Sequence, residues 1–167
     1  VFWQVIPDNP TRRVKPPKVE RKEAKYLDEG QTATLLRLLD NEPYQNQVMI
    51  RFFLLSGVRR GELCGLEWKD IDFKNNMITV CRTSQYLPEK GVFTKGTKTD
   101  SSVRSIKLPE QAFELLKEHR KWQRKKRIAM GDRWVDSDRI FAQDDGTPVH
   151  PDSITGWFHD FISRTDL

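Results

Sequence analysis

The sequence predicts a mainly α-helical domain with a small antiparallel β-sheet, the α+β class. Two observations lead to this prediction. Apolar residues recur at helical spacing in several segments, and two short segments between them are rich in β-branched residues. The 167 residues suffice for one domain with a sizeable core, and a hydrophobic content of 37% lies above the range typical of disordered chains.

The first 25 residues predict a basic linker. They contain four prolines and seven lysines or arginines. Proline fixes φ and lacks an N–H donor, so a regular element is not expected through this stretch. We therefore expect an interdomain linker at 1–25 and a folded domain at 26–167.

Two amphipathic helices are predicted next. The segment YLDEGQTATLLRLLD (26–40) opens with a capping box formed by Asp28 and Gln31. The segment PYQNQVMIRFFLLSG (43–57) is apolar around most of its circumference, so it should be central, and Gly57 is suited to end it. The side chains expected to be buried are Leu35, Leu36, Leu38, Leu39, Val48, Met49, Phe52, Phe53 and Leu55.

A short third helix is expected from Arg60 to Trp68, after which the pattern becomes strand-like. The segments MITVCRT (77–83) and VRSIKLP (103–109) predict two antiparallel strands, joined by a polar stretch with an irregular or mobile tip.

A longer helix is then predicted from Pro109 to about Arg127, followed by a short strand and a turn at 144–146. A last amphipathic helix is predicted within 151–164. The inward-facing residues expected on these two helices are Ala112, Phe113, Leu116, His119, Ile154, Trp157, Phe158 and Phe161.

The charge balance is basic, but with 29 basic and 24 acidic residues the excess is modest, so a polyanionic partner and a merely soluble surface explain it about equally well. The net charge is +5 and the pI about 9.3, which points first to nucleic acid and second to an anionic membrane surface. No apolar run approaches the roughly 18 residues of a membrane span, and no signal-peptide pattern opens the chain, so we expect a cytoplasmic protein. Cys64 and Cys81 lack metal-ligand spacing and predict reduced thiols.

The segment FFLLSGVRRGELCGLEW (52–68) places charges inside an apolar run, where burial without a partner is costly. Arg59 is expected at the junction of two helices, where its planar guanidinium beside a helix N-terminus suits an oxyanion. Glu62 lies three residues later on the same face. From this spacing alone, a structural Arg–Glu ion pair is the favoured interpretation.

Two motifs in order change that interpretation. SGVRRGELCGLEWKDI matches Thr/Ser-Gly-x-Arg-x-x-Glu-Leu followed by Leu-x-Trp-x-Asp-Ile, and KTDSSVRSIKLP matches a Lys-Thr pair followed by Ser-x-Arg-x-Ile/Val-x-Leu-Pro. Together they resemble the tyrosine recombinase (phage integrase) family over nearly the whole chain. The resemblance is greatest to integrases of mobile elements such as conjugative transposons and prophages.

The resemblance implies a site-specific DNA recombinase that cuts and rejoins DNA through a 3′-phosphotyrosine intermediate, without metal, ATP or another cofactor. It implies that Arg59 is a catalytic arginine, that Lys98 protonates the leaving oxygen, and that Glu62 supports the site. The implied partners are double-stranded DNA at attachment sites and identical subunits in a synaptic tetramer.

The family's His-x-x-Arg box and nucleophilic tyrosine follow a segment like 151–165, and neither is found in this chain. We therefore expect a C-terminally incomplete catalytic domain that does not cleave DNA by itself. The residues expected to contact DNA are Arg12, Arg13, Lys15, Lys18, Arg60, Lys95 and Arg104. Lys98 is preferred to Lys95 as the acid because of its place before Ser102 and Arg104, and a solvated hairpin lysine is the alternative.

Other classes of protein remain open at this point. The main alternative is a non-catalytic DNA-binding regulator with a recombinase-like fold, although such a protein needs neither Arg59 nor Lys98 in a catalytic arrangement. A metal-dependent nuclease would use acidic residues, and an RNA-binding module would need stacked aromatics on a sheet, for which no pattern is found. The candidate acids are Asp132, Asp136, Asp138, Asp144 and Asp145. The basic segment 117–127 is more consistent with a solvated helix face than with a DNA contact.

Overall fold

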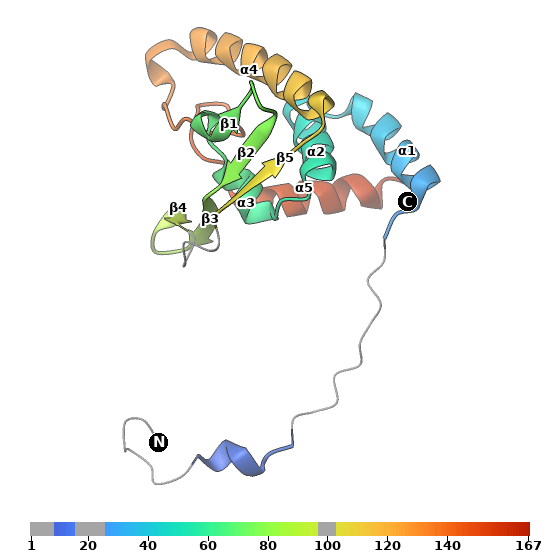
Figure 1. Cartoon of the computed structure of the whole chain (residues 1–167), viewed down its shortest axis with the longest axis vertical. Coiled ribbons are helices and arrows are strands. Elements are labelled where there is room, and N and C mark those ends of the chain that lie inside the picture. The colour runs from blue at the N-terminus through green and yellow to red at the C-terminus, as the bar shows by residue number, and fades with distance from the viewer. Residues whose placement is uncertain (1–8, 16–25, 97–102) are drawn as a thin grey trace.

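The computed structural model describes residues 9–15, 26–96 and 103–167. The helices are α1 (Glu29–Leu38), α2 (Tyr44–Ser56), α3 (Arg60–Gly65), α4 (Glu110–Met130) and α5 (Pro151–Ser163). Short 3-10 helices lie at Pro10–Arg13, Leu39–Asn41, Trp68–Asp70 and Gly131–Arg133. Figure 1 shows α4 along one side of the domain and α5 along the other, with α2 and the strands β1, β2 and β5 between them and the strands β3 and β4 projecting at the lower left. The expected fold class, mainly α with small antiparallel sheets, is confirmed.

The strands form two sheets. β1 (Ile71–Asp72), β2 (Met77–Val80) and β5 (Arg104–Lys107) make a three-stranded antiparallel sheet in the order β1-β2-β5. Ile78 lies opposite Ile106 in this sheet, so the predicted pairing of the two β-branched segments is confirmed. The second sheet is a hairpin of β3 (Arg82–Leu87) and β4 (Gly91–Gly96), in which Ser84 lies opposite Thr94.

The local signals for the first two helices are also confirmed. Asp28 caps α1, and its carboxylate accepts a 2.8 Å hydrogen bond from the backbone N–H of Gln31, whose side chain accepts one in return from the N–H of Asp28. Gly57 ends α2 with φ of 59°, a left-handed conformation that costs glycine little.

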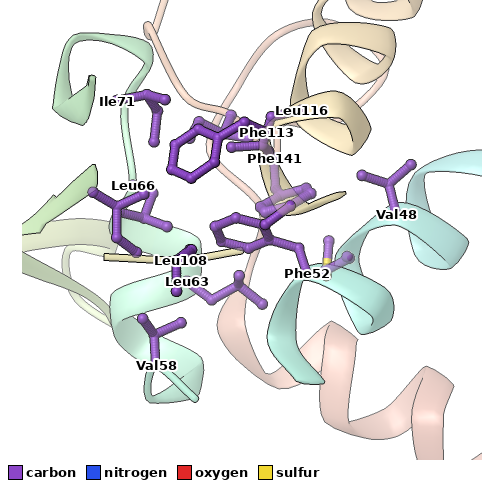
Figure 2. Packing of buried hydrophobic residues seen from close by; sticks show 14 of the residues in the cluster. Val48, Phe52, Val58, Leu63, Leu66, Ile71, Leu108, Phe113, Leu116 and Phe141 are labelled. Carbon is purple, nitrogen blue, oxygen red and sulfur yellow. The ribbon is translucent and has the colours of Figure 1, made fainter. Parts of the chain in front are cut away.

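The core lies where α2, α3, α4 and the three-stranded sheet meet. Phe52 of α2 and Phe113 of α4 are fully buried together with Phe141, and the rings of Phe52 and Phe141 are 6.2 Å apart (Figure 2). Leu63 and Leu66, from α3 and the residue after it, pack into the same cluster. A second cluster joins α1, α2 and α5 through Leu35, Leu39, Ile50 and Phe161.

The structure corrects several predictions. The stretch between the two predicted strands is not irregular where it is described, because β3 and β4 pair through six residues each. The third helix ends at Gly65, since Leu66 adopts an extended conformation. The strand predicted after residue 138 is reduced to two isolated bridges, one between Arg139 and Glu67 and one between Ala142 and Pro148, although the turn is present.

Several burial predictions were also too strong. On α1 and α2, Leu36, Leu38 and Phe53 are half-buried rather than buried. Leu55 is 39% exposed because it lies on the outer side of α2. Of the four residues predicted to face inward on α5, Ile154, Trp157 and Phe158 are half-buried and only Phe161 is fully buried.

Two glycines of α3 allow the hairpin to lie directly on that helix. Gly61 and Gly65 are four residues apart and therefore share one face. A Cβ built on Gly65 would lie 3.1 Å from the carbonyl oxygen of Arg82 and 3.3 Å from the amide nitrogen of Ser84. A Cβ on Gly61 would meet the side chain of Thr83 and the carbonyl of Ser84. The strand β3 thus runs across α3 at backbone contact distance.

We predict that Gly65→Ala lowers the free energy of unfolding by about 1–2 kcal/mol, because the added methyl group must push the backbone of β3 away. This is the net change, after subtracting the gain in helix propensity of about 1 kcal/mol that replacing glycine with alanine normally brings. Urea denaturation of the chain measures the change. The matched control is Gly156→Ala in α5, where a Cβ meets nothing within 4 Å. That variant should be more stable than the wild type, whereas a stabilised Gly65→Ala variant would contradict the packing argument.

Candidate active site

The site is centred on the turn between α2 and α3. Gly57 ends α2 in the left-handed conformation, and the side chain of Val58 then enters the core, where it is 2% exposed. The next residue, Arg59, is extended and precedes the first turn of α3. This alternation of a glycine, a buried valine and an arginine leaves the Arg59 side chain at the surface while its backbone is fixed.

Glu62 is the buried carboxylate of the site. It accepts a 2.8 Å hydrogen bond from the backbone N–H of Arg59 and a 3.1 Å bond from Nη1 of the same residue. It also accepts two bonds from Arg104 of β5, at 2.9 Å from Nη1 and 2.7 Å from Nη2. Chiefly because Arg104 donates this pair of bonds, the pKa of Glu62 is lowered to about 2. The carboxylate is therefore charged throughout the neutral range.

The two guanidinium groups differ in exposure. The Arg59 side chain is 81% exposed, whereas that of Arg104 is 37% exposed. Within the described ranges, Glu62 is the only partner of the Arg59 side chain, so most of its five N–H donors face solvent. The hydrogen bonds from Arg104 to Glu62 raise the pKa of Arg104 above its already high value. Two cations and one anion leave a net positive charge at an exposed position, an arrangement that suits an oxyanion ligand.

The other predicted site residues lie in different surroundings. Arg60 forms a 2.9 Å ion pair with Asp152 and a 2.6 Å hydrogen bond with Thr155, so it ties α3 to α5. Lys95 is exposed on β4, opposite Thr83. In the segment 9–15, the side chains of Arg12, Arg13 and Lys15 are exposed. Lys18 and Lys98 lie outside the described residues.

A second charged group, which the sequence did not predict, forms where the hairpin meets the end of α3. Arg82 of β3 pairs with Asp70 and, at 3.0 Å, with Glu67. Arg139 is 6% exposed and donates hydrogen bonds to the carbonyl oxygen of Gly65 and the hydroxyl of Thr94. The sequence indicates this group only through the high density of charged residues in LEWKDID and around Arg82. That density does not show which residues form ion pairs with one another.

Two of the histidines and two of the candidate acidic residues form contacts that stabilise the fold. His119 is fully buried, its Nε2 lies 2.8 Å from the carbonyl oxygen of Ile140, and burial lowers its pKa to about 4. His150 caps α5 by accepting from the N–H of Asp152. Asp136 and Asp144 pair with Arg127 and Lys126.

The described residues offer no evidence of a metal site or a membrane span. No group of three or more His, Cys, Asp or Glu that could hold a metal ion is found in 9–15, 26–96 and 103–167. Among these residues, no helix is long and apolar enough to cross a membrane. Cys64 and Cys81 are free thiols, as predicted, and burial raises the pKa of Cys64 to about 11.

Comparison with known proteins identifies the family. The family model described as the phage integrase family matches residues 25–167. The chain therefore belongs to the phage integrase family, and the resemblance carried by the two sequence motifs is confirmed.

Relatives of known name agree with this assignment. A "Tyrosine recombinase XerC-like" protein of Caldanaerobacter subterraneus is 29% identical over 69% of this chain and 33% of its own length. The prophage integrase IntR of Escherichia coli is 34% identical over 50% of this chain and 20% of its own. The ICEBs1 integrase of Bacillus subtilis is 26% identical over 100% of this chain and 45% of its own. The chain thus spans less than half the length of these relatives.

Solved structures show the same fold. The Tn1549 transposon integrase in complex with transposon right end DNA superposes with a TM-score of 0.77 at 22% identity, over 98% of this chain and 53% of that one. A lambda integrase tetramer bound to a Holliday junction gives a TM-score of 0.59 at 15% identity, over 97% of this chain and 40% of that one.

We predict that Glu62→Gln lowers the free energy of unfolding at pH 7 by about 1–2 kcal/mol, because an amide cannot hold two guanidinium groups as a carboxylate does. The pKa of Glu62 is depressed in the fold, so its contribution is complete above the unfolded value of about 4.5 and is lost as the pH falls towards about 2. The difference between wild type and variant should therefore narrow between pH 4.5 and 2. Urea denaturation across that range measures it.

The control for this prediction is Glu118→Gln, which removes an exposed ion pair with Lys121. Exposed pairs contribute little, so its effect should stay below about 0.5 kcal/mol at every pH. A Glu62→Gln effect that does not change with pH would show that the carboxylate charge is not what stabilises the junction.

Proposed function

We propose that the protein containing this chain is a site-specific DNA recombinase of a mobile element, an integrase that cuts and rejoins duplex DNA. The observation that carries the proposal is the Glu62 junction. It holds an exposed guanidinium, that of Arg59, in a fixed backbone setting and braces it with a second cation, that of Arg104. Membership of the phage integrase family and the names of the prophage and ICEBs1 relatives support this function.

The proposed reaction is a phosphoryl transfer to a tyrosine. The phenolic oxygen attacks phosphorus, a new P–O bond forms, and the P–O5′ bond breaks, so the DNA keeps a 3′-phosphotyrosine and a free 5′-hydroxyl. Arg59 donates to the non-bridging oxygens, on which negative charge must be stabilised in the transition state. Lys98 gives its proton to the departing 5′ oxygen. Glu62 does not touch the DNA but orients Arg59.

The three tyrosines of this chain are not proposed as the nucleophile. Tyr44 packs against Trp122 with ring centroids 5.2 Å apart, and the ring of Tyr86 lies 4.1 Å from that of His150. Tyr26 comes shortly before α1, ahead of both motifs. We place the nucleophile and the His-x-x-Arg box in a part of the protein beyond this chain, and we expect the chain alone to be inactive.

The proposed partners are double-stranded DNA and further copies of the protein in a synaptic tetramer, acting in the cytoplasm where bacterial DNA is accessible. Arg59 and Arg104 already supply cationic charge at the phosphate, so no metal or cofactor forms part of the proposal. The Tn1549 and lambda structures, which contain DNA, and the tetrameric state of one of them support these partners.

We predict that the full-length product of the gene forms a covalent adduct with an attachment-site duplex that carries a nick next to the cleavage site. Cleavage of this substrate releases a short strand that diffuses away, so the adduct cannot be religated. Arg59→Ala should slow adduct formation by about 100-fold or more, because charge in the transition state loses its fixed donor. Lys98→Ala should slow it by a similar factor, because the leaving oxygen departs unprotonated. Denaturing gels of time points measure the rate.

The control is Arg37→Ala, which removes an exposed arginine from the last turn of α1 and should leave the rate unchanged. Specific binding of the duplex without any adduct would favour the regulator instead. Cleavage that chelation of divalent metal abolishes would favour the nuclease. Normal rates in both Arg59 and Lys98 variants would overturn the assigned roles.

We also predict that the basic residues before α1 bind the DNA backbone. Glutamine at Arg12, Arg13, Lys15 and Lys18 should weaken binding and flatten the slope of log K against log salt, by about 0.9 for each phosphate that is no longer neutralised. The control variant removes the same number of charges by placing glutamine at four exposed residues of α4, and it should leave the slope nearly unchanged. These residues are Lys117, Lys121, Arg124 and Lys125. Fluorescence anisotropy across a salt series measures both, and equal slopes in the two variants would contradict the prediction.

A further inference from the structure

The buried arginine at position 139 connects three segments that are distant in the sequence. It follows the irregular chain after α4, where the amide of Ile140 donates to the carbonyl of Leu66 at 3.1 Å and the amide of Trp68 donates to the carbonyl of Asp138 at 3.0 Å. These bonds fix the backbone on both sides of Arg139 against the end of α3. The side-chain amide of Gln123 in α4 also donates to the Arg139 carbonyl, at 3.0 Å.

The Arg139 guanidinium forms a bridge from α3 to the hairpin. Nη1 donates to the carbonyl oxygen of Gly65, the last residue of α3, and lies 3.5 Å from the carboxylate of Glu67. Nη2 donates to the hydroxyl of Thr94 on β4. The side chain is 6% exposed, and burial lowers its pKa. Removing a guanidinium from water is costly, so these few directed bonds are what hold it there.

The bridge acts on the hairpin together with the glycine face of α3. β3 rests on Gly61 and Gly65, and Ser84, which touches both glycines, lies directly opposite Thr94. Arg139 therefore holds β4 at the point where β3 rests on the helix. With the glycines below β3 and Arg139 bound to β4, both strands are fixed relative to α3, the helix that begins next to Arg59.

We propose that Arg139 and Thr94 are positioning residues for general-acid catalysis. They fix β4 relative to α3, and hence the strand that leads into Lys98 relative to Arg59. Lys98 follows Gly96, the last residue of β4, by two positions and lies outside the described residues. The inference rests on the proposed function. Arg139 and Thr94 should affect proton transfer from Lys98 to the leaving oxygen, and they should not affect how Arg59 stabilises the negative charge on the phosphate.

A change of leaving group separates these two effects. When sulfur replaces the bridging 5′ oxygen of the DNA, the departing group is a thiolate, a far weaker base than an alkoxide, and it leaves without a proton. A residue that acts through the general acid should matter for the oxygen substrate and not for the sulfur substrate. A residue that acts on the phosphate charge, or on folding, should matter equally for both.

The experiment measures single-turnover cleavage by the full-length protein at saturating DNA, with matched oxygen and sulfur substrates. Thr94→Val and Arg139→Lys should each slow the oxygen substrate by about 10-fold or more, since small displacements of a catalytic group cost up to about 100-fold. Both should cleave the sulfur substrate within about 2-fold of the wild type. Thr94→Ser, which keeps the hydroxyl, should restore the rate on oxygen. The Kd for DNA should not change in any of these variants.

Matched variants calibrate the result. Thr79→Val makes the same substitution in β2, where the hydroxyl lies 3.4 Å from that of Ser105 of β5, and it should behave as wild type on both substrates. Lys98→Ala should be slow on oxygen and restored on sulfur. Arg59→Ala should be slow on both, because its role does not depend on the leaving group.

Each outcome has a distinct meaning. Equal slowing of both substrates by Thr94→Val and Arg139→Lys, or no slowing of either, would overturn the positioning inference while leaving the recombinase function intact. A Lys98→Ala variant that stays slow on sulfur would overturn the general-acid role and the inference with it. A wild-type protein that forms no adduct with either substrate would overturn the proposed function itself.

Discussion

The site depends on one buried carboxylate, that of Glu62. Two guanidinium groups held close together repel each other, and an anion between them turns that repulsion into a stable arrangement. Glu62 does this from the first turn of α3, because it reaches back to the backbone and side chain of Arg59 and across to Arg104 on β5. The hydrogen bonds from Arg104 and Arg59 lower the pKa of Glu62, which keeps the carboxylate charged at neutral pH. The position of the exposed Arg59 guanidinium is therefore fixed by the buried Glu62 carboxylate.

The short helix α3 can serve as this platform because it is held from several sides. The core anchors it through Leu63, the hairpin rests on its glycine face, and Arg60 binds α5. A helix of six residues has little stability of its own, so its position comes from these tertiary contacts. The N-terminal end of the helix, where the Arg59 side chain is 81% exposed, stays open to solvent, and the proposed function places the DNA phosphate there.

Polar contacts join the hairpin to the rest of the domain, together with the packing of β3 on the glycines of α3 and of the Tyr86 ring on His150. Arg82 and Arg139 meet Glu67 and Asp70 at the base of the hairpin, and the buried hydroxyl of Ser84 has no hydrogen-bond partner among the described residues. Buried charges of this kind add little net stability, but their directed bonds specify orientation. An orientation held by a few bonds can be altered by single substitutions while the core stays intact, which makes the hairpin accessible to experiment.

The sequence by itself determined the features that depend on neighbouring residues. The capping box of Asp28, the stop at Gly57 and the proximity of Arg59 to Glu62 all involve groups within four positions, and the β-branched segments identified the paired strands β2 and β5. Only the tertiary structure decided that Arg104, 42 residues from Glu62, completes the site, that 82–96 is a regular hairpin, and that Arg139 binds it. Local hydrogen bonds and hydrophobic periodicity are encoded in short stretches of chain. The meeting of distant charges depends on how every strand and helix between them packs, and no short pattern carries that information.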